Sequence, residues 1–399
     1  MKRYLKHYDL SLEFVRYSIY DCLDGSTSGK QRWTRHDTAC FIAEYWKKWM
    51  SEHGFDVPSD NVLIEEIRDK ARNDRSRLYP IVDWICREIY KEIKTRTLTF
   101  PPITYEDRYD KVAKKTRRIG ISGMKQQCCD YIAVNACKQM FLAKIGHYQC
   151  ASLKRKGQLF GKQAIETWIR TNPKKCKYCW KGDVKKYYPS VNHKILKKLI
   201  DRDIADLDVK YLISCLIDTY EEGLCIGSYL CQYLANYMLS YAYHYVMEML
   251  YVERRGKRIK LVNHALFYMD DLLLIGSSKK NVKMASKLLE TYLHEKLGLS
   301  IKPTHQLFPI NSRPIDMMGY RIYTYKTTVR KRIFNNANKV FVRYKNPNNV
   351  IELEDARKIV SYYGYFKHSY SYKYMKKIKL NITINKAKGV ISNATKCTV

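Results

Sequence analysis

The chain has 399 residues, and 46% of them are hydrophobic, which excludes a disordered or low-complexity protein. Its 73 Lys and Arg residues face only 39 Asp and Glu residues, so the formal net charge is +34. This excess predicts a polyanionic partner, either nucleic acid or an anionic membrane surface. The length allows two or three domains.

The N-terminus and the cysteines bear on the compartment. Lys2, Arg3 and Lys6 interrupt the first residues and no apolar run follows them, so no signal peptide is expected. The 13 cysteines are odd in number and lack the spacing of a disulfide framework. We therefore expect reduced thiols and a cytoplasmic protein. Cys176 and Cys179 form a single CxxC without a second pair, which argues against a zinc site there.

Residues 1–100 predict a helical extension. Phe41, Tyr45 and Trp49 recur at helical spacing, and a second helix is predicted over residues 81–93. The segment 99–102 contains two prolines, which end this pattern and mark a domain boundary.

For residues 101–310, the sequence predicts a domain that contains both helices and strands. A basic segment at 111–118 is followed by a predicted helix at 126–145, a basic turn at 154–157 and a second predicted helix at 162–169. A strand is predicted at 178–184 and a further helix at 193–200. The uncharged segment 223–247 is long enough to cross a bilayer. However, it contains Gln232, Asn236 and His244, and tyrosines recur every four residues from 229 to 241. A buried helix of a soluble core is therefore predicted, with no membrane partner.

Asp270 and Asp271 lie between two apolar runs, residues 264–267 and 272–275, which predict a hairpin with the acids in its turn. Acidic residues are common in surface turns, which is the competing interpretation. Asp183 ends the earlier strand, so three carboxylates would converge if these strands were antiparallel neighbours. Grouped carboxylates need cations, and oxygen ligands favour Mg²⁺ or Mn²⁺. Two such ions about 3.5–4 Å apart are a general device for phosphoryl transfer.

Residues 311–399 predict a basic C-terminal domain that follows a helix over 282–293. A strand pair is predicted at 315–325, and the remainder is predicted to be helical. These 89 residues carry 19 Lys and Arg against 4 Asp and Glu.

Four segments, in this order along the chain, resemble the motifs of reverse transcriptases. They are the A motif at Lys181–Ser190, the B motif at Ile226–Gln232, the YxDD box at Phe267–Asp271 and the primer-gripping strand at Asp316–Tyr320. The similarity covers roughly residues 100 to 380. It implies an α+β right-hand polymerase fold, with an antiparallel palm sheet and mixed fingers in residues 101–310 and a helical thumb in 311–399.

The resemblance also implies roles for individual residues. The catalytic residues would be Asp183, Asp270 and Asp271, which with the carbonyl of Val184 would hold two Mg²⁺ or Mn²⁺ ions. The residues implied to bind the nucleotide are Tyr188, Lys186, Ile226, Gly227, Gln232 and Arg118. Those implied to bind nucleic acid are Arg155, Lys156, Met318, Gly319, Tyr320, Lys373, Lys376 and Lys377. The competing interpretations are a core aromatic for Tyr188 and a solvated basic face for Arg118, Arg155 and Lys156.

The B motif departs from the commonest pattern, Gln-Gly followed by Ser-Pro. This chain has Ile226–Gly227 and then Cys231–Gln232. The apolar-Gly start and the final Gln resemble the diversity-generating retroelement branch and neighbouring bacterial lineages, including defence-associated enzymes. The cysteine departs from that branch too, which leaves the subfamily open.

The implied function is RNA-directed DNA synthesis in a bacterial or phage retroelement or an antiphage defence system. The implied partners are an RNA template, a DNA product and dNTP, with a specific structured non-coding RNA and an accessory protein or a second copy of the chain as further candidates. Two alternatives stay open: a template-independent or protein-primed polymerase, and a catalytically silent RNA-binding protein.

Overall fold

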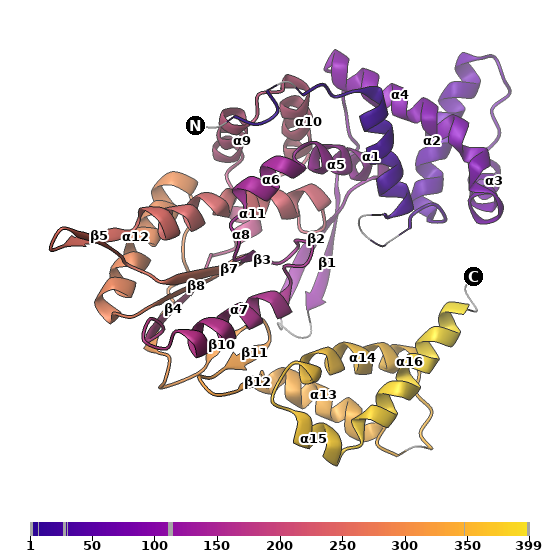
Figure 1. Cartoon of the computed structure of the whole chain (residues 1–399). Coiled ribbons are helices and arrows are strands. Elements are labelled where there is room, and N and C mark those ends of the chain that lie inside the picture. The colour runs from indigo at the N-terminus through magenta and orange to yellow at the C-terminus, as the bar shows by residue number, and fades with distance from the viewer. Residues whose placement is uncertain are drawn as a thin grey trace. The chain divides into compact units, whose positions relative to one another are not determined.

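The protein is an α+β protein, as predicted, with helices and strands distributed along the whole chain (Figure 1). The structure is a computed structural model that describes residues 3–6, 8–26, 29, 31–110, 115–346 and 348–396. The chain divides into two compact units. Unit 1 comprises Met1–Gly146, Lys186–Tyr241 and Leu293–Leu299, and unit 2 comprises His147–Lys185, Ala242–Tyr292 and Ser300–Val399.

The N-terminal part of unit 1 is helical, as predicted. Its helices are α1 (Leu12–Asp24), α2 (His36–Glu52), α3 (Asp60–Asn73), the short 3₁₀ helix η1 (Arg75–Leu78) and α4 (Tyr79–Thr95). Helix α1 begins where Ser11 Oγ accepts a hydrogen bond from Phe14 N–H, and it ends at Gly25, whose φ of 67° suits a glycine. The aromatic stripe of α2 buries Phe41 and Tyr45.

The predicted helix over 126–145 is two helices, α5 (Met124–Ala136) and α6 (Lys138–Lys144). They meet at Cys137, whose φ of −86° and ψ of 3° interrupt the α-helical geometry. The hairpin of β1 (Thr104–Asp110) and β2 (Lys115–Ile121) was not predicted. Its strands are mostly exposed on both faces, so they lack the apolar alternation by which a half-buried strand is recognised.

The rest of unit 1 is helical. It contains α8 (Tyr187–Ser190), α9 (His193–Asp203), α10 (Leu207–Asp218) and most of α11 (Tyr229–His244). Tyr237 of α11 is fully buried, whereas Tyr229, Tyr233 and Tyr241 are half-buried. The Tyr237 hydroxyl donates to Asp203 Oδ2 at 2.9 Å. The buried helix predicted for this segment is therefore confirmed. Among the described residues, no helix combines the length and the apolar character needed to cross a membrane.

Unit 2 is built on a five-stranded sheet in the order β3-β7-β8-β4-β9. Its strands are β3 (Gln149–Cys150), β4 (Tyr178–Asp183), β7 (His264–Tyr268), β8 (Asp271–Gly276) and β9 (Gln306–Pro309). The sequence predicted an antiparallel sheet. The observed sheet is mixed, because β3 pairs with β7 in parallel. Helix α7 (Gln158–Thr171) packs beside it through Ile165, Trp168 and Ile169, in one core with Leu266 and Leu273.

Further elements complete unit 2. A second sheet joins β10 (Ile315–Met317), β11 (Tyr320–Ile322) and β12 (Thr327–Val329), one strand more than the predicted pair. The remaining elements are the π-helical turn η2 (Tyr245–Met249), the hairpin of β5 (Tyr251–Arg254) and β6 (Lys257–Lys260), and α12 (Lys279–Leu297), which ends in unit 1.

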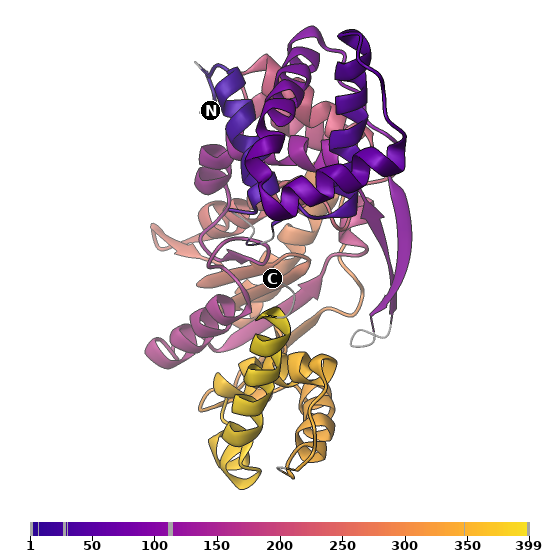
Figure 2. The same ribbon diagram turned by 90° about the vertical axis from the view of Figure 1, so that its right-hand side faces the viewer.

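The tail is helical as predicted, with α13 (Lys331–Arg343), α14 (Leu353–Lys367), α15 (Tyr372–Lys377) and α16 (Leu380–Lys396) packed together (Figure 2). Phe341 and Phe366 form the centre of this helical core.

Candidate active site

The predicted carboxylates of unit 2 meet at one end of the five-stranded sheet. Strands β4 and β8 are antiparallel neighbours, and their register places Asp183 directly opposite Asp271. Asp270 lies in the tight turn between β7 and β8, where Met269 has a positive φ of 51°. The carbonyl of Asp270 accepts a hydrogen bond from Val184 N–H at 2.9 Å. The backbone therefore fixes the turn against the end of β4.

Two lysines lie beside these acids. Lys181 Nζ is 3.5 Å from Asp271 Oδ1, and Lys302 Nζ is 3.6 Å from Asp183 Oδ1. The pKa of Asp271 is raised, chiefly by burial and further by the charges of Asp183 and Asp270, whereas Lys181 lowers it. Neither lysine was singled out from the sequence, because each meets its carboxylate only in the folded chain. Lys181 reaches Asp271 through the pairing of β4 with β8, and Lys302 lies beside Asp183 because its N–H donates to the carbonyl of Asp183 at 2.8 Å.

The metal expectation concerns the same side chains. Across the described part of the chain, no three His, Cys, Asp or Glu side chains are already arranged to hold a metal ion. The backbone fixes the proximity of the three acids, while two of the carboxylates have lysine partners. The metal site, including the carbonyl of Val184, stays a prediction.

A cavity of about 450 Å³ opens beside Asp183. Lys181, Arg313 and Arg321 line it, and so do Asp316 and Arg330, whose Oδ1 and Nη2 atoms lie 2.6 Å apart. Cationic side chains thus surround the space next to a carboxylate, an arrangement suited to an anionic group such as a phosphate.

The predicted basic turn lies at the same end of the sheet as the acids. Strand β3 runs parallel to β7, with Cys150 opposite Tyr268, so the chain that follows β3 emerges beside the turn that carries Asp270. Arg155 is exposed and has a positive φ of 63°, and the carbonyl of Lys156 accepts from Ala151 N–H at 2.8 Å. The pKa of Lys156 is lowered, mainly by burial. Contact of these two cations with nucleic acid stays a prediction.

The turn between β10 and β11 contains Met318 and Gly319, and Tyr320 follows it. Met318 and Tyr320 are 4% and 3% exposed, so their side chains pack inside unit 2 rather than face solvent. A Cβ on Gly319, which has a φ of 83°, would lie 2.5 Å from the ring of Tyr365. These residues hold the hairpin in place, and their contact with nucleic acid stays a prediction. Lys373, Lys376 and Lys377 are exposed on α15.

The predicted nucleotide-binding residues belong to unit 1. Tyr188 is half-buried, whereas its neighbour Tyr187 is 3% exposed and donates its hydroxyl to the carbonyl of Ala235 at 2.6 Å. The core aromatic at this point is therefore Tyr187. Lys186 is exposed, with a positive φ of 44° before α8.

The B-motif residues are tied to the end of β2. Gly120 N–H donates to the carbonyl of Ile226 at 3.1 Å. Gly227 has a φ of 127°, and a Cβ there would lie 2.7 Å from the carbonyl oxygen of Gly120, so only glycine fits. Gln232 is half-buried in the first turn of α11.

Arg118 on β2 is exposed and has two partners. Its guanidinium lies 3.9 Å from the centre of the Tyr105 ring, and Nη2 is 3.2 Å from Glu221 Oε2. Its predicted role toward a nucleotide requires this exposed ion pair to open, which costs little.

Asp130 is a residue that the sequence reasoning missed. It is fully buried on α5, and its Oδ2 accepts from Ser228 Oγ at 2.7 Å and from Tyr229 N–H at 3.1 Å. Ser228 Oγ in turn accepts from Cys231 N–H at 3.1 Å. Burial raises the pKa of Asp130 to about 7, against the hydrogen bonds that lower it. A single carboxylate thus anchors the start of α11 immediately after Gly227. The available signal was a lone acid within a mainly apolar helix.

No family model and no curated protein matches this chain. Solved structures with partial similarity include the apo telomerase from Candida tropicalis truncated from its C-terminal domain, at 14% identity and a TM-score of 0.42, covering 71% of this chain and 70% of that one. The Sicinivirus 3Dpol RNA-dependent RNA polymerase has 12% identity and a TM-score of 0.44, over 76% of this chain and 67% of that one. The telomerase from Candida albicans in complex with a TWJ fragment of telomeric RNA has 12% identity and a TM-score of 0.43, over 75% and 60%. These values establish no activity or ligand for this chain.

Proposed function

We propose that this chain is an RNA-directed DNA polymerase with a right-hand polymerase fold, which transfers a nucleotide from dNTP to a primer 3′-hydroxyl. The observation that supports this best is the register of the sheet, with Asp183 opposite Asp271 and Asp270 in the adjoining turn. Three carboxylates held close together repel one another, and a bound cation would offset this repulsion.

Two Mg²⁺ or Mn²⁺ ions would be held by Asp183, Asp270 and Asp271, with the carbonyl of Val184. The oxygen donors suit such ions, and the pKa of Asp271 is raised chiefly by burial and further by the charges of Asp183 and Asp270, which a divalent cation would offset. When bound, the ions would neutralise phosphate charge and polarise the reacting oxygens. The chain itself contributes the fixed register of the acids and the cationic cavity beside Asp183.

The nucleotide and the strands would be held by other residues. The ring of Tyr188 would exclude a 2′-hydroxyl and so select dNTP, while Gly227 would let the backbone approach the nucleotide. Positive charge across the chain would bind the template and product through their phosphates. The setting would be the cytoplasm of a bacterium, in a retroelement or an antiphage defence system, with a structured RNA and an accessory protein or a second copy of the chain as further partners.

One observation favours a second candidate, a catalytically silent RNA-binding protein. Lys181 and Lys302 lie within 3.6 Å of two of the acids, so the protein already offers them cationic partners. In that case the carboxylates would serve the structure through ion pairs, and no divalent cation would be needed.

Primer extension with Mg²⁺ and dNTP tests both candidates, using a primed RNA template, a primed DNA template and a primer alone. We expect extension on the RNA template that depends on Mg²⁺ and is absent from Asp270→Asn. Extension of the primer alone would instead support a template-independent polymerase. RNA binding without extension, unchanged in Asp270→Asn, would support the silent RNA-binding protein.

A further inference from the structure

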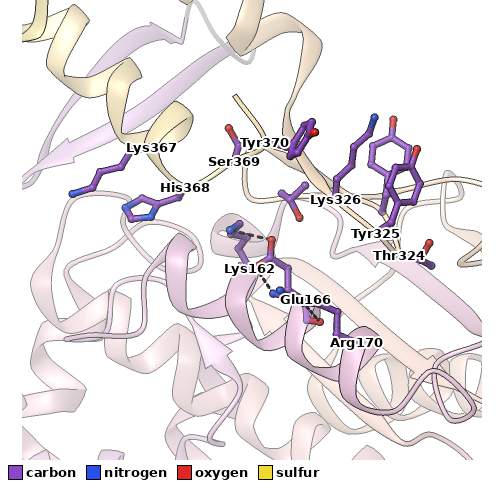
Figure 3. Close-up of a pocket in the computed structure, with 12 residues that line it drawn as sticks. Lys162, Glu166, Arg170, Thr324, Tyr325, Lys326, Lys367, His368, Ser369 and Tyr370 are labelled. Carbon is purple, nitrogen blue, oxygen red and sulfur yellow. Dashed lines mark hydrogen bonds and ion pairs between the residues drawn. The ribbon is translucent and has the colours of Figure 1, made fainter. Parts of the chain in front are cut away.

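A second cavity of unit 2 lies at a different place from the carboxylates. It has a volume of about 320 Å³, which is within the range of about 300–1,000 Å³ common for ligand sites. Three segments line it: helix α7, the turn between β11 and β12, and residues 367–370 at the end of α14 (Figure 3).

The lining is strongly cationic. Four Lys or Arg residues line the cavity together with one carboxylate: Lys162, Arg170, Lys326 and Lys367 with Glu166. Both oxygens of that carboxylate are already engaged, because Lys162 Nζ lies 3.0 Å from Glu166 Oε1 and Arg170 Nη2 lies 3.3 Å from Oε2. The pKa of His368 is lowered mainly by burial, and the positive charges of Lys162 and Lys367 lower it further.

Aromatic rings stand among these cations. Tyr325 is 75% exposed and Tyr370 is 69% exposed. Lys326 Nζ lies 5.1 Å from the centre of the Tyr325 ring and 5.9 Å from those of Tyr323 and Tyr370 (Figure 3).

The two segments that carry these rings are held by the backbone. Tyr370 N–H donates to the carbonyl of Thr327 at 2.7 Å, and Tyr323 N–H donates to that of Lys326 at 2.8 Å. The rings are therefore presented from defined positions on one rim of the cavity.

We propose that this cavity binds a segment of single-stranded nucleic acid. Its bases would stack on Tyr325 and Tyr370, and its phosphates would pair with Lys326, Lys367 and Arg170. Exposed rings interleaved with cations are the means by which proteins hold single strands, since every base has a face for stacking and every linkage carries a charge. The exposed faces of these rings favour an unpaired strand over a duplex, because the bases of a duplex are already stacked on one another.

The site is separate from the predicted primer-gripping turn. That turn, Met318–Gly319, precedes β11, whereas Tyr323–Lys326 follows it. The three residues of β11 lie between the two turns, a span of roughly 10 Å at about 3.3 Å per residue. The proposal goes beyond the polymerase function and does not require it, because strand binding can be measured without dNTP.

Photo-crosslinking of the full chain locates the strand directly. The probes are single-stranded oligomers of about ten nucleotides, a length that suits single-strand sites, of RNA with 4-thiouridine or of DNA with 4-thiothymidine. We expect crosslinked peptides from residues 323–327 or 367–370. Crosslinking by RNA, by DNA or by both supports the site and identifies the strand. Crosslinks only elsewhere in the chain, with both probes, would overturn the proposal.

Fluorescence anisotropy with the same oligomers measures the contribution of the rings. The double variant Tyr325→Ala/Tyr370→Ala should bind a single strand at least about tenfold more weakly, given about 1–3 kcal/mol for each stacked base. Affinity for a blunt duplex should not change. Tyr17→Ala, which removes another ring that is 61% exposed, is the matched control and should bind as the wild type does. Equal single-strand affinity in the double variant and the wild type, or an equal loss for the duplex, would overturn the proposal. Extension of a preannealed primer is a separate readout that tests the polymerase proposal alone.

Discussion

The two units hold carboxylates in opposite ways. In unit 2, Asp183 and Asp271 lie at strand ends with their side chains 34% and 26% exposed, beside Lys302 and Lys181. In unit 1, Asp130 has no exposed surface and accepts hydrogen bonds from a hydroxyl and a backbone N–H. The first arrangement keeps charge where one cation can replace another. The second uses a fully buried carboxylate to fix the start of a helix.

The largest effect is expected at the unit 2 acids. Asp183→Asn and Asp270→Asn should each abolish polymerisation, because loss of a metal ligand removes several kcal/mol of transition-state stabilisation. RNA binding should be nearly unchanged, since affinity comes from phosphate contacts spread over many cations. Extension rates and RNA affinity are the two measurements. Asp218→Asn, which alters an exposed acid paired with Lys197 at 2.6 Å, is the control. An Asp183→Asn rate above about a tenth of wild type, a loss under about 1.4 kcal/mol, would refute the assignment.

The unit 2 acids were also the part of the site that the sequence predicted best. The run Leu272–Ile275 is buried on both faces, so it appears as a continuous apolar segment, and the acids before it mark the turn. Asp130 gave no comparable signal, because its partner Ser228 lies 98 residues away and the two meet only in the folded chain. The same holds for Lys181 and Lys302.

The fold was predicted where one face of an element is buried. The aromatic stripe of α2 and the tyrosines of α11 correctly indicated helices. The β1–β2 hairpin was missed because its strands are mostly solvated, and the sheet was predicted as purely antiparallel because β3 has only two residues. Such pairings depend on tertiary contacts rather than on local pattern.

The next effect concerns sugar selection at Tyr188. Tyr188→Ala should admit ribonucleotides, whereas Tyr188→Phe should not, because both lose the hydroxyl but only the first loses the ring. A steric contact of this size is worth about 10- to 200-fold in discrimination. The measurement is the ratio of kcat/KM for dNTP and NTP. If Tyr188→Ala discriminates as the wild type does, the gate lies elsewhere.

Asp130 should affect stability before chemistry. Asp130→Ala leaves Ser228 Oγ and Tyr229 N–H without their acceptor in a buried site, which should cost about 1–3 kcal/mol of the free energy of unfolding. Asp130→Asn keeps an oxygen at that place and should lose less. Denaturant unfolding of the two variants measures the difference, and equal stability in Asp130→Ala and wild type would contradict the anchoring role.

The raised pKa of Asp130 adds a pH dependence with a defined sign. The folded pKa of about 7 lies above the ordinary value of 3.8, so the unfolded chain releases this proton first as pH rises. Stability from this group should therefore be complete below about pH 4 and should fall through pH 7. Tyr220 and Cys231 nearby stay protonated in that window, because burial raises the pKa of each. Asp130→Asn should flatten the Tm profile between about pH 4 and 7, and an unchanged slope would show that Asp130 does not titrate there.

The smallest effect is expected from the exposed cations of the tail. Unlike the acids of unit 2, none of these cations is expected to be essential on its own. Lys373, Lys376, Lys377 and Lys379 are exposed, and replacing all four with Gln should weaken the grip on the template–primer duplex. Phosphate contacts release counterions, so the log–log slope of affinity against salt, about −0.9 per contact on duplex DNA, should become shallower. Products should shorten while addition of a single nucleotide survives.

A matched set on α12 separates binding from solubility. Lys279, Lys280, Lys283 and Lys287 are also exposed, so changing them to Gln removes the same charge from another surface. If the tail lysines bind phosphates, only the tail variant should flatten the salt slope. If both variants kept the wild-type slope, the tail lysines would serve solubility alone, as surface charges commonly do. If both flattened it equally, the effect would come from net charge, and the tail would have no specific role in holding the duplex.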